Sequence, residues 1–234
     1  MVALDRAADD PRLPYALGTT EELEAVVAGT RASDRVTSVI ADACDADAMT
    51  DAVALAEGRF EGLNAMIVAA GVIAGGVPLW ELPPEQERAV IEVDLRAVLT
   101  AARVSVPAML RRPQPRDGRF IAVASTAATR GMPMIAAYCA AKAGVLGLVR
   151  SLAAELRGTG VTANAVSPGS TRTQILEESS RLYGLVSAEV FARQHTLERL
   201  LEPEEIAALI VWLASPAAGG MTGTAVPIDA GLAL

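Results

Sequence analysis

A serine, a tyrosine and a lysine within residues 120–142 are spaced so that they could move protons. The apolar run Phe120–Ala124 predicts a buried strand, and Ser125 follows at its expected end. Tyr138 comes thirteen residues after Ser125, and Lys142 four after Tyr138, in an alanine-rich segment that favours helix. Because residues four apart share a helix face, the tyrosine hydroxyl and the lysine ammonium can approach the same small volume. We therefore expect proton chemistry at the end of this strand.

The composition favours one soluble, cytoplasmic domain with a sizeable core. The chain has 234 residues, 52% of them hydrophobic, but no run of about 18 apolar residues lacks a charge, so we expect no transmembrane helix. The start, MVALDRAADD, does not resemble a secretory signal. A net charge of −8 argues against nucleic-acid and anionic-membrane partners. Cys44 and Cys139 lack CxxC spacing, so neither a metal site nor a disulfide framework is predicted.

Short apolar segments that predict strands alternate with longer segments that predict helices, which indicates an α/β fold with a parallel sheet covered on both faces. The expected strands are Val2–Leu4, Val36–Ala41, Ala65–Gly71, Phe120–Ala124, Val161–Val166 and Ala225–Ile228. The expected helices are residues 19–29, 45–58, 85–111, 136–156 and 202–213. Ligands of such folds bind at the carboxyl ends of the strands. Asp5, Asp42, Gly71, Ser125 and Pro168–Gly169 fall at those ends.

Four motifs together resemble the short-chain dehydrogenase/reductase family over nearly the whole chain. They are Ser125, the Tyr138-x-x-x-Lys142 pair, Asn164–Gly169 continuing to Thr173, and Thr222–Gly223 before Asp229. More narrowly, GVIAGGVPLWE (71–81), TAATRGMPMIAAYCAAK (126–142) and VSPGSTRT (166–173) resemble actinobacterial members described as mycofactocin-coupled. The family resemblance implies a Rossmann-type doubly wound parallel sheet in a single domain. It also implies hydride transfer between NAD and a secondary alcohol or ketone.

The resemblance makes Tyr138 the acid/base, with Lys142 beside it and Ser125 holding the substrate oxygen. A free tyrosine has a pKa of about 10, too high for an efficient base near neutrality. Lys142 and an oxidised nicotinamide ring are cations that favour the phenolate, so we expect the pKa of Tyr138 to fall by about two or three units. The alternative is that Tyr138 only packs a helix and Ser125 only caps a strand.

Asp94 occupies the position where the family usually carries a catalytic asparagine that helps to hold a water linking the lysine to solvent. Three interpretations are open. If the backbone carbonyl holds the water, aspartate serves equally well. A carboxylate could instead pair with Lys142 and reduce its influence on Tyr138. Asp94 could also be a solvated helix residue without a role.

The resemblance also implies a set of cofactor contacts. Asp5 at a strand end would accept from the adenosine ribose hydroxyls and repel a 2′-phosphate, which favours NAD over NADP, although Arg6 could soften that preference. The alternative for Asp5 is a loop aspartate. By the same resemblance, Asp42 and Ala43 would border the adenine, and the small residues Ala69, Ala70 and Gly71 would permit close backbone approach to the cofactor. The nicotinamide and pyrophosphate side would be lined by Pro168, Gly169, Thr171 and Thr173, and Tyr138 and Lys142 would also contact the cofactor.

Residues 170–200 resemble the family's substrate lid, with an ordinary loop–helix connection as the alternative. The expected lining is Leu176, Leu182, Tyr183, Leu185 and Phe191, with Trp80 as a further candidate. This composition, without a cluster of basic residues, favours a small apolar alcohol or ketone as substrate. His195, the single histidine, is expected at the surface without a catalytic role.

The sequence contains no TGxxxGxG phosphate loop and starts at what should be the family's second strand. Without the first strand, Val2–Leu4 and Val36–Ala41 should lack a partner that joins them to the strand of Ile67. One explanation is a late-called start or a truncated chain, and the other is a non-catalytic scaffold or regulatory subunit derived from the fold. In either case we expect a homodimer or homotetramer that associates through the helices 85–111 and 136–156.

Overall fold

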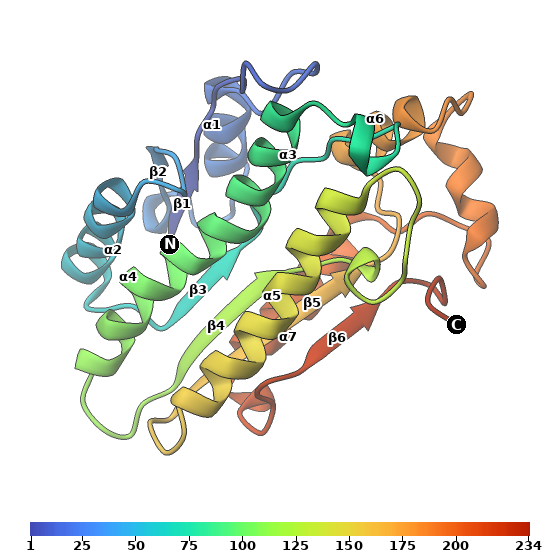
Figure 1. Cartoon of the computed structure of the whole chain (residues 1–234). Coiled ribbons are helices and arrows are strands. Elements are labelled where there is room, and N and C mark those ends of the chain that lie inside the picture. Colours follow the sequence, from blue (N-terminus) through green and yellow to red (C-terminus); the bar gives the residue numbers. More distant parts are fainter.

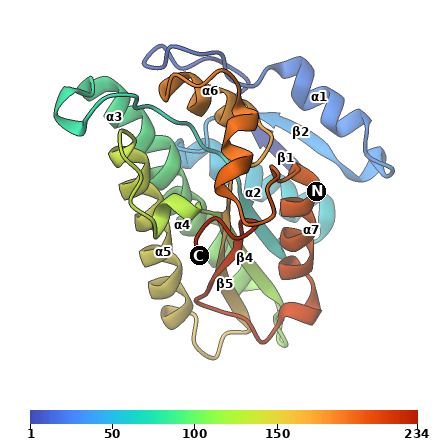
Figure 2. The same ribbon diagram turned by 90° about the vertical axis from the view of Figure 1, so that its right-hand side faces the viewer.

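Parallel strands lie at the centre of the molecule, and helices cover both of their faces (Figures 1 and 2). The computed structural model describes residues 1–234. The strands are β1 (Val2–Asp5), β2 (Thr37–Ile40), β3 (Ala65–Val68), β4 (Gly118–Val123), β5 (Val161–Pro168) and β6 (Ala225–Ile228). The helices are α1 (Thr20–Ala28), α2 (Ala46–Phe60), α3 (Pro84–Ile91), α4 (Ala97–Arg111), α5 (Ala136–Glu155), α6 (Gln174–Leu182) and α7 (Pro203–Ala214). Short 3₁₀ turns cover Ser33–Arg35, Leu79–Glu81, Thr126–Ala128, Ala188–Gln194 and Pro216–Ala218.

The strands form two separate hydrogen-bonded sheets. β1 pairs with β2, while β3, β4, β5 and β6 form a second sheet in that order, and every pairing is parallel. No ladder joins β1 to β3, which confirms the expectation that the first two strands lack a partner linking them to the strand of Ile67. Two large apolar side chains of these short strands remain exposed, Ile40 at 57% and Ile67 at 42%. Each of the two sheets therefore carries a large apolar side chain that other elements leave uncovered.

The core is organised around β4, whose successive side chains alternate between the two faces of the sheet. Phe120 is fully buried in a cluster with Val145 and Val149 of α5. Its neighbour Ile121 is fully buried on the opposite face, with Leu213 of α7. Because both faces of the strand are covered, its residues form a continuous apolar run in the sequence. This run is the pattern that predicted a buried strand. β4 therefore holds the segment that follows it, starting at Ser125, in a fixed position.

Local capping explains why α1 starts where the sequence predicts. The Thr19 hydroxyl accepts from the Glu22 N–H at 3.2 Å, and the Glu22 carboxylate accepts from the Thr19 N–H at 2.9 Å. This reciprocal capping box satisfies two N–H groups that would otherwise lack a partner.

The expected continuous helix over 85–111 is interrupted. α3 ends at Ile91, residues Glu92–Arg96 form a π-helical turn, and α4 follows from Ala97. A π-turn widens the helix by one residue per turn and changes which side chains face inward. No proline or glycine lies within residues 85–96 to mark this turn, so the sequence pattern predicted a regular helix. The turn contains Asp94 and points this side chain into the protein, where it is fully buried.

α5 is the one helix long and apolar enough to cross a membrane by length and composition alone. In this structure it packs against the sheet, with Val145, Leu146 and Val149 buried in the core. It also carries Lys142 and Arg150 within its apolar stretch. Its length and apolar character are accounted for by its place in the core.

Candidate active site

Ser125, Tyr138 and Lys142 meet at the carboxyl end of β4. Ser125 follows the strand and caps the next turn, because its hydroxyl accepts from the Ala127 N–H at 3.1 Å. The Ser125 side chain acts on the Tyr138 hydroxyl and partly opposes the rise in the pKa of the tyrosine. One turn further along α5, the Lys142 Nζ lies 5.5 Å from the centre of the Tyr138 ring. The spacing of the three residues therefore predicted their proximity correctly.

Lys142 is held by two oxygens. Its ammonium donates to the backbone carbonyl of Val123, the last residue of β4, at 3.2 Å. It also lies 2.9 Å from Asp94 Oδ1, and both side chains are almost completely excluded from solvent. Asp94 Oδ2 accepts from the Val72 N–H at 3.4 Å. Of the three interpretations of Asp94, the structure has the carboxylate paired with Lys142, and the interpretation as a solvated helix residue is wrong.

The charges of this cluster decide the proton affinity of Tyr138. Burial raises the pKa of Tyr138, the positive charge of Lys142 opposes the increase, and the negative charge of Asp94 adds to it; the net direction is upward. Burial alone would lower the pKa of Lys142, but the charges of Asp94 and Tyr138 raise it above its ordinary value. The expectation of a lowered tyrosine pKa is therefore wrong for the chain by itself. Burial, which the expectation did not weigh, is the largest cause of this rise, and the charge of Asp94 adds to it.

A cavity of about 670 Å³ opens beside these residues and collects side chains from six segments of the chain. Of the residues predicted from the sequence, its walls include Ala69, Gly71, Ser125, Tyr138, Lys142, Pro168, Gly169, Thr171 and Thr173. Asp94 lies behind Lys142, outside the lining. Asp5, Asp42, Ala43 and Ala70 also lie outside it, at or just beyond the ends of β1, β2 and β3. The cavity thus joins the catalytic candidates to the expected nicotinamide-side contacts, but not to the expected adenosine-side contacts.

The two aspartates at the ends of β1 and β2 each close a turn. Asp5 Oδ1 accepts from the Ala7 N–H at 2.7 Å, and Asp42 Oδ1 accepts from the Cys44 N–H at 2.8 Å. Asp5 is exposed and Asp42 half-buried. Both carboxylates therefore hold their own loops together. Because Asp5 is exposed, its carboxylate can also be reached by a ligand.

The expected lid contributes most of the apolar wall. Leu176, Tyr183, Leu185 and Phe191 line the cavity, whereas Leu182 does not and instead packs near Gly76. The rings of Tyr183 and Phe191 meet edge to face with centres 6.1 Å apart. Trp80 is 84% exposed and lies outside the lining, so its expected place at the pocket is wrong.

His195 is buried, with 3% of its surface exposed, so the expectation that it lies at the surface is wrong. Its Nε2 accepts from the Ser170 N–H at 3.1 Å, which leaves Nδ1 to donate to the Phe191 carbonyl at 3.1 Å. Because the backbone N–H can only donate, these two contacts require the neutral ring with its proton on Nδ1. His195 therefore connects the segment that follows β5 to the turn Ala188–Gln194.

Sequence reasoning missed Tyr15, which lies in the irregular connection between β1 and α1. Its hydroxyl accepts from the Ile73 N–H at 2.8 Å, and burial raises its pKa to about 12. It packs in the same apolar cluster as Tyr138. Asp10 anchors this connection through ion pairs with Arg6 and Arg12. No periodicity or capping signal in residues 6–18 indicated that the segment folds back over α5.

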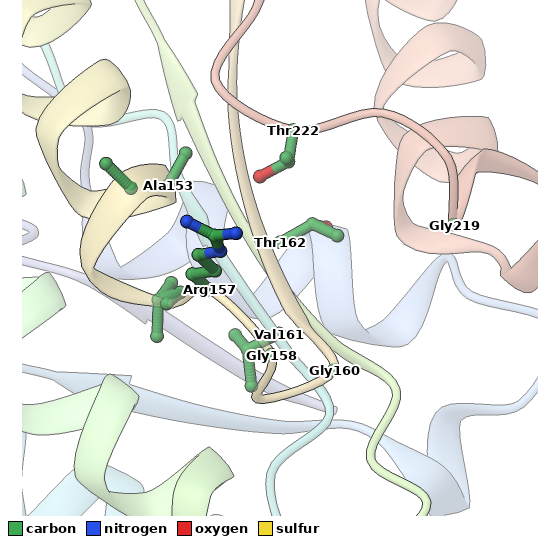
Figure 3. Close-up of a pocket in the computed structure, with 10 residues that line it drawn as sticks. Ala153, Arg157, Gly158, Gly160, Val161, Thr162, Gly219 and Thr222 are labelled. Carbon is green, nitrogen blue, oxygen red and sulfur yellow. The ribbon is translucent and has the colours of Figure 1, made fainter.

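A second cavity, of about 580 Å³, lies at the amino end of β5, away from the catalytic candidates (Figure 3). Arg157 provides its one charged lining side chain, alongside glycines and small residues such as Thr162 and Thr222. None of the predicted site residues lies there. The titratable groups with catalytic geometry are therefore gathered at the carboxyl end of the sheet.

The fold and site define a Rossmann-type oxidoreductase, and comparisons with known proteins agree. Residues 15–233 match the family model described as enoyl-(acyl carrier protein) reductase. The chain belongs to the short-chain dehydrogenase/reductase family.

Three similar proteins illustrate the relationship. The 2-dehydro-3-deoxy-L-rhamnonate dehydrogenase (NAD(+)) of a Sphingomonas strain is 33% identical over 81% of this chain and 74% of its own length. Cis-4-hydroxycyclohexanecarboxylate dehydrogenase of Sinomonas cyclohexanicum is 33% identical over 86% of this chain and 78% of its own length. The crystal structure of carveol dehydrogenase from Mycobacterium avium, in complex with NAD, superimposes with a TM-score of 0.91 at 26% identity, covering 99% of this chain and 87% of that one.

Proposed function

We propose that this chain is an NAD-dependent dehydrogenase/reductase that transfers a hydride between nicotinamide and a small, apolar secondary alcohol or ketone. The observation that carries the proposal is the convergence of Ser125, Tyr138 and Lys142 on one cavity whose remaining wall is largely apolar. A hydroxyl pair that can hold and protonate a carbonyl oxygen, beside a buried cation, is suited to acid/base chemistry at that oxygen.

The cavity can admit the nicotinamide end of the cofactor beside its small residues. Ala69 and Gly71 let a planar ring approach the backbone near the end of β3. Toward the adenosine, Asp5 is exposed at the end of β1, where a carboxylate disfavours a 2′-phosphate and supports NAD over NADP. The similar carveol dehydrogenase was solved with NAD.

When bound, NAD supplies the site that accepts or gives up the hydride. The protein's own residues manage the oxygen and its proton. Ser125 orients the substrate oxygen, and Tyr138 gives its proton to that oxygen during reduction or takes it back during oxidation. Lys142 stabilises the tyrosinate that remains, while the Val123 carbonyl and Asp94 keep the ammonium in place. The apolar lid side chains exclude water from the reacting carbon.

The lining favours an uncharged substrate. Apart from Lys142, the only charged side chain on the cavity is Arg130, whose guanidinium donates to the Leu232 carbonyl at 2.5 Å. Aliphatic and aromatic groups make up most of the rest, including Ile73, Ile135 and Phe191. One similar structure is named for an uncharged alcohol, carveol, whereas another relative is named for a hydroxy acid, cis-4-hydroxycyclohexanecarboxylate.

We further infer a single domain over residues 1–234 with residues 170–200 as its lid, acting in the cytoplasm as a homodimer or homotetramer. α5 supports association because small residues such as Ala140, Ala143 and Gly147 lie on its outer side, where another helix could approach closely. The narrower resemblance to mycofactocin-coupled members stays a prediction.

A second candidate function, as a non-catalytic scaffold or regulatory subunit, is favoured by one observation. The β1–β2 pair is not joined by hydrogen bonds to the sheet that carries the catalytic candidates.

The two functions are distinguished by titrating the chain with NADH and following the nicotinamide fluorescence, then assaying oxidation of cyclic secondary alcohols with NAD. Saturable binding and turnover support the enzyme. A stable oligomer by native mass spectrometry that neither binds NADH nor turns over supports the scaffold.

A further inference from the structure

The feature that the proposed reaction leaves unexplained is a buried carboxylate directly behind the catalytic lysine. Asp94 has no exposed surface, and its Oδ1 lies 2.9 Å from Lys142 Nζ without any other hydrogen-bond partner. A buried charge is retained only where a partner compensates for its lost hydration. Asp94 and Lys142 therefore form a unit in which each charge requires the other.

The backbone around the pair is shaped to admit it. The π-turn Glu92–Arg96 directs Asp94 inward, and the Val72 N–H donates to its Oδ2 at 3.4 Å. A methyl group at Gly71 would lie 3.0 Å from Asp94 Oδ1 and 3.4 Å from Lys142 Nζ. A π-turn on one side and a glycine on the other thus leave space for this contact and fix its position.

The pair lies close enough to Tyr138 to control its charge. Since Lys142 Nζ lies 2.9 Å from Asp94 Oδ1 and 5.5 Å from the centre of the Tyr138 ring, the carboxylate lies within about 8.4 Å of that ring. A lone ammonium would attract a tyrosinate, but an ammonium already neutralised by a carboxylate attracts it much less.

The other polar groups near the tyrosine have smaller effects on its pKa. Ser125 lowers it, and Cys139, its neighbour on α5, raises it. Tyr15 faces the cluster from the connection between β1 and α1. Glu178 of α6 acts on Tyr15 and is itself paired with Arg181. Lys142 is thus the one cation that acts on Tyr138, and Asp94 is its counter-ion.

We propose that Asp94 is a positioning residue that acts through Lys142: by neutralising the ammonium it keeps Tyr138 protonated near neutral pH and so prepares the site to donate a proton to a ketone. This rests on the proposed function for its meaning in catalysis, but the charge state of Tyr138 can be measured without turnover. In the reductive direction the proton leaves the Tyr138 hydroxyl for the carbonyl oxygen, and the hydride comes from NADH. Oxidation of the alcohol needs the tyrosinate and is accordingly favoured at alkaline pH.

The test is an NMR titration of the full chain labelled with ¹³C at the tyrosine ζ carbon. The chain has three tyrosines, and the Tyr138 resonance is assigned as the one lost in Tyr138→Phe. Asp94→Asn removes the charge and keeps the size. With an effective dielectric constant of about 20, the change should lower the titration midpoint of Tyr138 by about one to one and a half pH units.

Glu92→Gln is the matched control, because Glu92 lies on the same π-turn but pairs with Arg12 rather than Lys142. Its Tyr138 midpoint should equal that of the unaltered chain. Circular dichroism shows whether each variant is folded. If Asp94→Asn does not fold, Asp94→Leu, which fills the space without a charge, is titrated instead with the same expected direction.

A midpoint in the Asp94 variant that is not lower than in the unaltered chain overturns the proposal, and so does the absence of a midpoint below pH 11.5 in both proteins. A lower midpoint in a chain that shows no turnover supports the role of Asp94 and refutes the proposed dehydrogenase activity. In an active chain, the pH profile of alcohol oxidation should move to lower pH in Asp94→Asn by the same interval.

Discussion

Replacing Lys142 with methionine should destabilise the protein severely and in a pH-dependent manner. The substitution leaves Asp94 without its counter-ion at a site with no exposed surface. Breaking a buried ion pair from one side typically costs about 3–5 kcal/mol, because the remaining charge is buried without compensation. For a chain of this length, 1 kcal/mol corresponds to a shift of roughly 2–4 °C in the melting temperature, so we expect a decrease of about 10 °C at pH 7.

The pH dependence follows from the direction of the carboxyl pKa. Burial raises the pKa of Asp94 and Lys142 opposes the increase, so removing Lys142 should raise the pKa further. A carboxyl group whose folded pKa lies above its unfolded value of about 3.9 destabilises the folded state as pH rises through that interval. The deficit of Lys142→Met should therefore be large at pH 7 and should shrink toward pH 4, where Asp94 is protonated in the folded variant and about half protonated in the unfolded chain.

The assay is urea unfolding followed by circular dichroism between pH 4 and pH 8. The matched control is the double variant Asp94→Leu with Lys142→Met, which removes both charges and should recover most of the lost stability, as replacement of buried ion pairs by apolar residues often does. A Lys142→Met protein within about 1 kcal/mol of the unaltered chain at pH 7, or a deficit that does not change with pH, would refute the reasoning.

Three further predictions follow from the same structure. Gly71→Ala should cost about 1–3 kcal/mol in urea unfolding, because its methyl group would crowd Asp94 and Lys142, whereas the control Gly58→Ala, in a helix and with nothing within 4 Å, should be neutral or slightly stabilising. Phe120→Ala should cost about 3–5 kcal/mol by the same measurement, since the ring is fully buried between the sheet and α5; a loss below 1 kcal/mol would contradict its place in the core. Asp5→Asn should narrow the preference for NADH over NADPH by about tenfold in fluorescence titrations, whereas an unchanged ratio would show that Asp5 acts only in its turn with Ala7.

The features that sequence predicted well depend on local chemistry or on periodicity. Thr19 and Glu22 form the capping box that their spacing indicated. The apolar run at Phe120–Val123 became a strand buried on both faces, and Tyr138 and Lys142 share one face of α5 as their spacing required. These predictions succeeded because each rests on a capping interaction or a repeat pattern that spans only a few residues of the chain.

The features that sequence missed depend on contacts between distant segments. A π-turn decides that Asp94 points inward to Lys142, and no residue in 85–96 marks it. Tyr15 reaches Ile73, 58 residues away, and His195 reaches Ser170, 25 residues away. Trp80, a large aromatic residue that composition would place in a pocket, is exposed. The rise in the pKa of Tyr138 also depends on tertiary structure, because it comes first from burial and then from the balance between the charges of Lys142 and Asp94.

The central claim is that the Tyr138 hydroxyl moves the proton in a hydride-transfer reaction. The most direct measurement compares the unaltered chain with Tyr138→Phe in the oxidation of cyclic secondary alcohols, following NADH formation under saturating NAD. The substitution removes one oxygen and should lower kcat by at least about 100-fold, while NADH binding and the circular dichroism spectrum remain unchanged. Activity of Tyr138→Phe within tenfold of the unaltered chain would contradict the account.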